Sequence, residues 1–538
     1  MAQPDDFFIQ MPFGNNILDT YGREILDTAG RNILDLDWAN INSDVLTETP
    51  ITIFQGQRDG SDPRARVADA GVIKFELDNS INNSGGLLGY YSPDNSNLRD
   101  PDFNLGMLVR VGMEKDSVTE WFAQGRITSI EPDPGLLGDK RVLVTAGDWM
   151  ELAANTVMPR IEVQESVTDD QALQTIIDAL GSDAPASTDL DVGDYTYEYA
   201  FTDVEDERTF IMSVLQSLGQ SGQGRLFITG SSTSGEVLKY VNLTNLLSIG
   251  TPVATFVNDF TAAKASRKVR TRVRRVLATA YPHAKDSAPV VLFNLTEELS
   301  IPAGETAEFV GYFRDPNDSS AKKIAAINVV QPVASTDFNF SSTSGSGSDL
   351  NASLGFEVWS VGTKSFRVRV VNNSGSTGYL WFYQVRGEGL YPYDELSYSA
   401  TDTTINERDG ITLDYDLPYQ STQPILAEVA SALLGWYSVE STQLPYIDFV
   451  PSLSEDDFEK MRVSKPGELV AATDTVTGIS YNMLVVGREL QIWNNGKYIH
   501  ARLYITPILQ VESGLYATLD TLGLDDLDGD NTILGFGS

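Results

Sequence analysis

The sequence contains no cysteine and only two histidines among its 538 residues. Without thiols the chain can form neither disulfides nor a thiolate nucleophile or thiolate metal site. His283 and His500 lie far apart in the sequence, and neither belongs to a nucleophile turn or to a His-Glu-x-x-His pair. We therefore expect structural or solvent-facing roles for both. The sequence predicts no catalytic residue, no metal site and no cofactor, so we do not expect an enzyme.

Basic residues and long apolar runs are also scarce. The 38 Lys and Arg residues stand against 75 Asp and Glu, which gives a formal net charge of −37. Such a charge repels nucleic acids and anionic membranes within the screening distance set by salt. No apolar run is long enough for a signal peptide or a membrane span. We expect a soluble protein with no specific nucleic-acid recognition and no stable membrane insertion.

The one basic run, residues 264–276, departs from this acidic background. A strand that turns its cationic face to an acidic neighbouring surface is the first interpretation. Contact with DNA is the second, and the sequence leaves both open.

Some acidic residues have the sequence spacing of catalytic carboxylates or of calcium ligands. Two adjacent pairs have the composition of glycosidase carboxylates: Asp169 with Asp170, and Asp525 with Asp526. Among 75 acids such pairs arise by coincidence. The series Asp526-x-Asp528-x-Asp530 begins like a calcium loop, but its twelfth position is Gly537 instead of a bidentate Glu. A solvated tail is the better interpretation of this segment.

A short repeat lies near the start of the chain. Near-identical octapeptides begin at Ile17, Ile25 and Ile33, the third continuing only as Ile-Leu-Asp-Leu. A unit this short cannot bury its own Ile-Leu pair, so it must pack on copies of itself or on another surface. A strand-turn ribbon on its own domain and an arm intertwined with neighbouring subunits remain equally open. Either one is typical of a structural building block.

The length predicts roughly three or four domains, and the fold class is expected to be mainly β. Period-2 alternation of apolar residues marks strands before residue 158, whereas a helical period appears at 167–181, 206–218 and 424–436. The predicted order is an octapeptide-repeat arm at 1–48, a first β-barrel at 49–160 with 260–285 as its candidate completion, a small α/β insertion at 161–258, a β-sandwich at 286–400, a second β-barrel with one helix at 401–512 and an acidic tail at 513–538.

Several segments, taken together, resemble the tail hub or minor tail protein family of long-tailed bacteriophages, which is related in architecture to baseplate hubs. The resemblance covers roughly residues 45–510 and lies in segments 70–79, 91–95, 106–111, 122–132, 144–148, 223–227, 312–317, 346–350 and 385–387. The octapeptide arm and the last residues depart from the family pattern.

The resemblance implies a structural virion component at the distal end of the tail tube. A homo-trimeric ring with two tail-tube-like barrels per chain would present six similar surfaces to a six-fold tube. Its partners would be the tail tube or a distal tail protein, the tape measure protein, and tail tip or fibre proteins. The ring would form a gated channel for DNA passage, after assembly in the host cytoplasm. An acidic lumen would keep DNA from adhering.

A tail-tip adhesin is the alternative function. Aromatic residues in 379–383 and 391–393 of the predicted sandwich offer a stacking surface for a host glycan, although alternate residues of such a strand must face the core. A wall-degrading enzyme is a third class, and the sequence shows no catalytic constellation for it.

Overall fold

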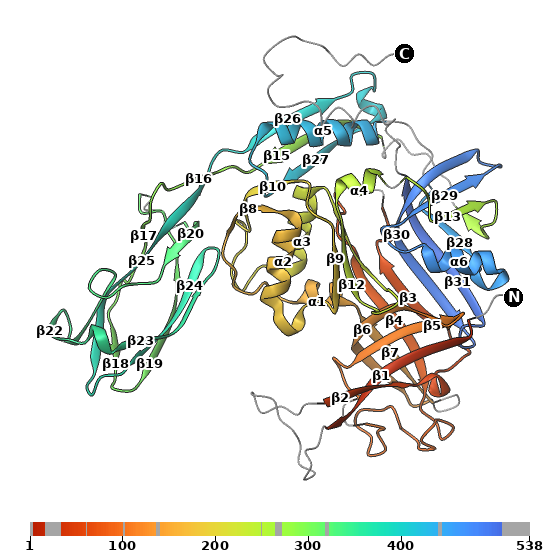
Figure 1. The fold of residues 1–538 in the computed structure, drawn as a ribbon, viewed down its shortest axis with the longest axis horizontal. Helices are drawn as coiled ribbons and strands as arrows, with labels where there is room; N and C mark the ends of the chain where they lie inside the picture. Colours follow the sequence, from red (N-terminus) through yellow and green to blue (C-terminus); the bar gives the residue numbers. More distant parts are fainter. Residues whose placement is uncertain are drawn as a thin grey trace.

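The computed structural model describes residues 4–16, 34–60, 62–100, 103–135, 140–248, 250–263, 272–317, 322–438 and 444–507. The described chain is mainly β and contains several sheets. Figure 1 shows a large sheet on the right, a helical module at the centre, a long two-layered arm on the left and a small helix-covered sheet above. None of the described helices combines the length and the apolarity that crossing a membrane requires.

The large sheet has thirteen strands. Its first half contains β1 (Asp6–Asn16), β2 (Leu34–Asn40), β3 (Ile51–Gly56), β4 (Asp69–Asp78), β5 (Leu108–Lys115), β6 (Val118–Asp133) and β7 (Arg141–Gly147). Its second half contains β13 (Ala254–Val257), β14 (Ala262–Ala263), β28 (Tyr446–Phe449), β29 (Leu469–Asp474), β30 (Ile479–Trp493) and β31 (Tyr498–Pro507). One apolar core runs through both halves, because alternate residues of their strands face inward.

Each half is built on a three-stranded meander around one long strand. β6, of 16 residues, pairs with β5 and β7, while β30, of 15 residues, pairs with β29 and β31. A Gly-Arg pair lies on both long strands, as Gly125-Arg126 and Gly487-Arg488. Each meander also contains a β-bulge, a feature that bends a strand and increases its twist. The two halves are therefore similar in plan.

Each half curls until its edges are linked by a short piece of chain. In the second half the strand order is β13-β29-β30-β31-β28-β14, and only residues 258–261 separate the two edge strands β13 and β14. In the first half the edge strand β2 leads through residues 41–50 into β3 at the opposite edge. Both connections pack against the core that their strands share, through Ile41 and Val45 in the first half and through Phe260 in the second, so each half curves around that core.

The sequence predicts two separate barrels, but the described strands form one continuous open sheet. β3 pairs with β30 over residues 51–56 and 487–492, which joins the halves edge to edge. Among the described residues no ladder closes either half on itself. Residues 260–285 are considered above as a completion of the first barrel, but their described strands pair elsewhere. β14 joins β28, β15 (Val273–Ala280) joins β26 (Leu396–Thr401) and β27 (Ile411–Leu417), and β16 (His283–Lys285) joins β25 (Gly378–Pro392). Strand periodicity gives no information about which distant strand becomes the partner.

The central module combines helices with two small sheets. Its elements are α1 (Trp149–Asn155), β8 (Gln164–Thr168), α2 (Asp169–Leu180), β9 (Ser187–Leu190), β10 (Thr196–Ala200), α3 (Ile211–Gly222), β11 (Arg225–Thr229), β12 (Val237–Val241) and α4 (Leu243–Ser248). The helix predicted at 167–181 is confirmed as α2. Its start is fixed by a capping contact in which the backbone N–H of Thr168 donates to the side chain of Gln171 at 3.1 Å.

The arm on the left of Figure 1 has two sheets that share one apolar core. One sheet contains β16 (His283–Lys285), β17 (Val290–Asn294), β18 (Leu299–Ile301), β20 (Ala325–Val330), β21 (Phe338–Thr343), β22 (Ser346–Asp349) and β25 (Gly378–Pro392), and the other contains β19 (Thr306–Tyr312), β23 (Leu354–Val361) and β24 (Ser365–Asn372). We call this pair of sheets the sandwich.

The helix predicted at 424–436 is confirmed as α5 (Gln423–Tyr437), but it does not pack on the strands of the large sheet. Its apolar face, with Leu426, Val429 and Leu433, packs on the three-stranded sheet β26-β15-β27. The second half of the large sheet carries α6 (Glu455–Val463) instead.

Candidate assembly interface

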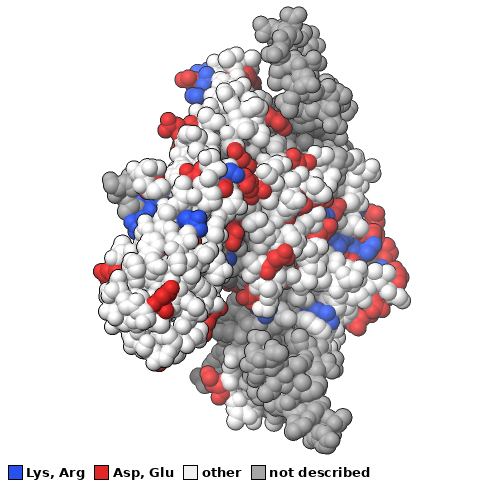
Figure 2. Space-filling view, turned by 60° about the vertical axis from the view of Figure 1, so that its left-hand side comes forward, with Lys and Arg blue, Asp and Glu red and all other residues white. Residues whose placement is uncertain are grey.

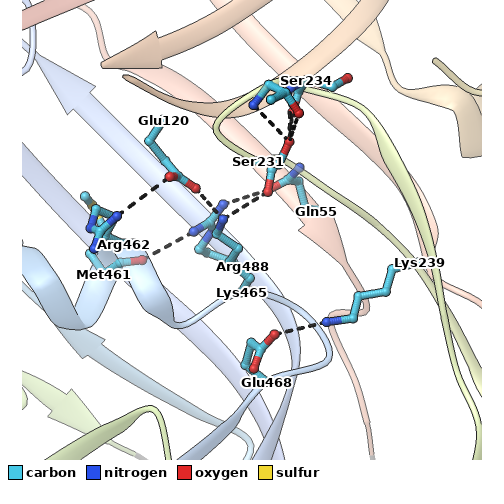
Figure 3. A network of polar contacts seen from close by, with 12 residues as sticks. Gln55, Glu120, Ser231, Ser234, Lys239, Met461, Arg462, Lys465, Glu468 and Arg488 are labelled. Atoms are coloured by element: carbon cyan, nitrogen blue, oxygen red, sulfur yellow. Dashed lines mark hydrogen bonds and ion pairs between the residues drawn. The ribbon is translucent and has the colours of Figure 1, made fainter. Parts of the chain in front are cut away.

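Buried polar side chains lie where the two halves of the large sheet meet (Figure 3). Arg488 of β30 is 1% exposed, and its Nη2 donates to Oε1 of Gln55 on β3 at 3.0 Å. Its Nη1 donates to the carbonyl oxygen of Met461 at 3.3 Å. Burial lowers the pKa of this guanidinium to about 10. A buried charge held from both halves favours one relative position of the two.

Glu120 connects three parts of the molecule. This carboxylate on β6 is 5% exposed and pairs with Lys465, which follows α6 in the second half. The ammonium of Lys465 also donates to the carbonyl oxygen of Gly230 in the central module at 3.1 Å. Nearby, Nζ of Lys239 on β12 lies 3.0 Å from Oε1 of Glu468. The central module is therefore bound to the second half through Lys465 and Glu468, and Lys465 in turn pairs with Glu120 of the first half (Figure 3).

A second buried junction involves Arg66, which precedes β4. Its guanidinium donates to the carbonyl oxygen of Gln223 at 3.1 Å, to Oε1 of the same residue at 2.9 Å and to the hydroxyl of Tyr415 at 3.3 Å. Gln223 ends α3 in the left-handed region with φ of 59°, and Tyr415 belongs to β27. This junction joins the large sheet to the central module and to the sheet under α5.

The sandwich is attached to the central module through Asp206. Its carboxylate accepts hydrogen bonds from the backbone N–H of Thr363 at 3.0 Å, the backbone N–H of Lys364 at 3.3 Å and the hydroxyl of Ser365 at 2.7 Å. Lys285 adds an ion pair with Glu165 at 2.5 Å. The contacts of Asp206 hold the loop between β23 and β24, whereas Lys285 attaches β16 to β8.

The residues that the sequence analysis considered for catalysis are not brought together. His283 lies in β16 of the sandwich and His500 in β31 of the large sheet, and burial lowers the pKa of His283. Asp169 is 1% exposed and accepts a hydrogen bond from the hydroxyl of Tyr240 at 2.5 Å, whereas Asp170 accepts one from the backbone N–H of Gly193 at 2.8 Å. Asp525, Asp526, Asp528, Asp530 and Gly537 lie outside the described residues, as do residues 17–33 of the repeat.

Only the end of the basic run is described, and its arginines contact their own chain. Nε of Arg272 donates to the carbonyl oxygen of Ser438 at 2.8 Å, and Nε of Arg275 donates to the hydroxyl of Ser399 at 2.7 Å. Arg274 pairs with Glu407 at 3.5 Å. Residues 264–271 lie outside the described residues.

The sequence analysis missed a group of three carboxylates, Asp259, Asp456 and Asp457, whose ligand oxygens lie within 4.8 Å of one another. Nζ of Lys460 binds Asp259, lies 2.7 Å from Asp456 and lies 3.6 Å from Asp457. Lys460 therefore compensates part of the negative charge of this group. Asp259 lies about two hundred residues before Asp456 and Asp457, so the spacing in the sequence did not indicate this group.

One face of the molecule carries scattered acidic side chains, and one edge of the large sheet carries no further described strand. Figure 2 shows acidic side chains scattered over one face, while basic side chains form only small separate groups. Within the described residues β2 pairs with β1 alone, so its other edge carries no strand. Asn16 and Leu34 are opposite each other at the end of this pair, and the octapeptides lie between them in sequence.

No protein-family model and no curated protein matches this chain. Among solved structures, the 43 kDa tail protein of prophage MuSo2 from Shewanella oneidensis matches with a TM-score of 0.46 and 9% identity, over 93% of this chain and 98% of that one. A tail protein from Neisseria meningitidis MC58 matches with a TM-score of 0.44 and 10% identity, over 93% of this chain and 96% of that one.

An Escherichia coli component of the type VI secretion system, described as similar in structure to two bacteriophage T4 tail proteins, matches with a TM-score of 0.32 and 8% identity, over 86% of this chain and 74% of that one. All three TM-scores are below 0.5, so the function of this chain has to be argued from its own geometry. Two of these three solved structures are tail proteins, and the third is a component of a secretion system.

Proposed function

We propose that this protein is a structural tail component, a hub that joins the tail tube to the tail tip. The observation that carries the proposal is the pair of similar curled halves in one chain, each built on a meander around a long strand with a Gly-Arg pair. Three copies in a closed ring present six such halves. A ring of three chains can then match a tube with six-fold symmetry, because each chain contributes two similar halves.

The buried junctions support a mechanical role. The halves share a β3–β30 ladder, and Glu120, Lys465 and Arg488 lie buried or partly buried across the same boundary. Separating the halves would leave these charges without partners, which is costly in a buried setting. The ring therefore transmits force as a rigid body, with the sandwich as an outward extension.

The charge supports a channel for DNA. A wall of the same sign as phosphate does not hold DNA during transit, and the chain carries a net charge of −37. In this arrangement the tail tube or a distal tail protein binds one face of the ring, and the tail tip or fibre proteins bind the other. The tape measure protein occupies the channel until the gate opens.

The octapeptide arm is proposed to dock on an adjacent tail protein by strand addition at the edge of β2 that no described strand covers. The test is to delete residues 17–33 and join Asn16 to Leu34 by a short Gly-Ser turn, because these two residues are already opposite each other. A larger deletion is uninformative, since Phe7, Ile9 and Met11 of β1 belong to the core. Normal tails from this variant would contradict the docking role.

The hub role is tested by electron microscopy of intact particles labelled with an antibody to this chain. Label confined to the end of the tail, with three-fold averages there, is the expected result. Label on fibres would favour the adhesin, and particles without label would contradict the virion assignment.

One observation favours the second candidate, a tail-tip adhesin. Trp381 of β25 and Tyr393 just after it are 40% and 65% exposed on the sandwich, whereas Tyr383 is buried. Exposed aromatic rings can stack on sugars. Binding of the whole protein to host cells that is lost in Trp381→Ala would support this function, and unchanged binding would contradict it.

A further inference from the structure

A long loop joins β4 to β5 in the first half of the large sheet. It spans residues 79–107, and its described residues form no helix or strand. Its first part closes on itself, because the backbone N–H of Gly89 donates to the carbonyl oxygen of Asn79 at 3.1 Å. We call residues 79–89 the closed loop. Connections of this length are uncommon in compact domains, and those that keep a fixed conformation are usually functional.

Buried polar side chains fix the conformation of the closed loop. Asn83 is 5% exposed, and its side-chain oxygen accepts hydrogen bonds from the backbone N–H of Gly85 at 3.1 Å and of Leu87 at 3.3 Å. Its Nδ2 donates to the carbonyl oxygen of Leu87 at 2.7 Å. Asp44 is 1% exposed and accepts from the backbone N–H of Ser84 at 2.7 Å and from its hydroxyl at 2.5 Å. The loop is therefore bound to the first half by groups removed from water.

The outer face of the closed loop is apolar. Ile81 is 67% exposed, Leu87 is 44% exposed and Leu88 is 46% exposed. Polar side chains thus point into the molecule and apolar ones into solvent, which reverses the usual arrangement. A loop that is already fixed loses little conformational entropy when it binds. The closed loop therefore has the properties of a preformed contact surface.

The closed loop also lies in an uncharged part of an acidic chain. No charged side chain occurs between Asp78 and Asp94, although the chain has a net charge of −37. Two copies repel each other wherever their acidic surfaces meet, and acidic side chains are spread over the face in Figure 2. A contact between copies therefore needs a surface without carboxylates. A basic partner protein would be attracted by the carboxylates themselves, so an uncharged apolar surface favours a second copy as its occupant.

We propose that the closed loop is a contact surface between copies of this chain, with Ile81, Leu87 and Leu88 packed on the neighbouring copy. The inference deepens the proposed hub and rests on it for the number of copies. In a closed ring every contact is heterologous, so the loop of one copy meets a different surface of the next. Asp44 and Asn83 are positioning residues, because they fix the backbone that carries the three apolar side chains.

Sedimentation velocity of the whole protein tests the contact in solution. The wild type should form trimers, and Leu87→Ser with Leu88→Ser should raise the dissociation constant by about tenfold or more, because two apolar side chains lose their burial. The matched control is Val333→Ser on the sandwich, which removes an apolar side chain that is 52% exposed and should associate like wild type. Circular dichroism shows whether each variant is folded.

The salt dependence gives a second measurement on the same samples. Added salt should strengthen the association of the wild type, because it screens the repulsion between acidic copies and leaves an apolar contact in place. A wild type that stays monomeric at every concentration overturns the proposal. A leucine variant that associates like wild type, or an association that weakens as salt is added, overturns it as well.

Cross-linking separates this inference from the proposed function. A photoreactive amino acid at position 88 should link two copies of the chain, which mass spectrometry identifies as linked peptides of this chain alone. A link from position 88 to a different tail protein in intact particles would overturn the contact and leave the hub role standing. Self-association that depends on the leucines, together with particles that carry no antibody label, would support the contact and contradict the hub.

Discussion

At the scale of single residues, the most consequential side chains are charged groups removed from water between modules. Glu120 is 5% exposed and faces the cations of Lys465 and Arg462. Deleting one member of a buried ion pair leaves the other charge uncompensated, at a cost of several kcal/mol. An exposed ion pair of the same composition contributes little, because water screens it.

Glu120→Ala should therefore destabilise the contact between the two halves by about 3 kcal/mol. The matched control is Glu308→Ala, which removes an exposed carboxylate that pairs with Arg367 and Arg369 on the sandwich. This variant should be close to wild type in stability, because water screens exposed ion pairs. Thermal unfolding followed by tryptophan fluorescence measures both variants. Similar losses in the two would contradict a special role for the buried pair.

Asp169 makes stability depend on pH. Burial raises the pKa of its carboxyl from 3.8 to about 7, although Tyr240 donates a hydrogen bond to it. Between these two values the unfolded chain has lost the proton that the folded protein still holds, so stability falls as pH rises through this window. Above about pH 7 the folded carboxyl is ionised too, and this contribution stops changing.

Asp169→Asn should remove that contribution while keeping a side chain of the same shape. Burial also raises the pKa of Asp148 to about 7, so the difference between wild type and variant isolates Asp169. The melting temperature of wild type minus that of the variant should decrease from pH 4 to pH 7 and then level off. Parallel curves across this range would contradict the assignment.

At the scale of elements, the edge contact of β3 with β30 decides the architecture. Gly487 lies opposite Gly56, and a Cβ at position 487 would come within 2.2 Å of the carbonyl oxygen of Gln57. Only glycine permits this approach, and the backbone oxygen cannot move aside without disturbing the ladder.

Gly487→Ala should cost about 1–3 kcal/mol, the usual effect of overpacking, and should speed hydrogen exchange in β3 and β30. The control is Gly435→Ala in α5, where a Cβ meets no atom within 4 Å and alanine favours the helix. If neither variant changed the stability or the hydrogen exchange, the β3–β30 ladder would be shown to accommodate a Cβ at position 487.

The loop that attaches the sandwich is a second such element. Asp206→Ala removes the acceptor for Thr363, Lys364 and Ser365. The sandwich should then move relative to the central module, which small-angle X-ray scattering would record as a larger radius of gyration. Asp349→Ala in β22, which leaves this loop untouched, should scatter like wild type, and an unchanged Asp206→Ala profile would show that other contacts suffice.

The sequence predicts elements better than it predicts their partners. Strands β4 to β7 and helices α2 and α5 follow directly from apolar periods of 2 and 3.6 residues. The β3–β30 ladder and the Glu120–Lys465 pair do not, because each joins residues several hundred positions apart. The same limit concealed the buried junction between the two halves, since a buried Arg488 and an exposed Arg126 occur in the same Gly-Arg context.

At the scale of the whole molecule, one chain contains two similar curled halves, a central module that binds both, and an arm that Asp206 and Lys285 attach to the central module. Figure 1 shows the halves together at one side and the sandwich extending from the other. In a ring of three copies the halves would surround the channel, and the sandwich would extend from the ring toward tail tip or fibre proteins. A net charge of −37 per chain would then surround the DNA path with charge of its own sign.

The most direct test of this account is a cryo-electron microscopy map of the tail tip in intact particles. The account predicts three copies of this chain in a closed ring, with six curled sheet halves around a central channel and the sandwich at the periphery. A map in which the chain occurs in another copy number, or in which its two halves do not alternate around the tail axis, would contradict it.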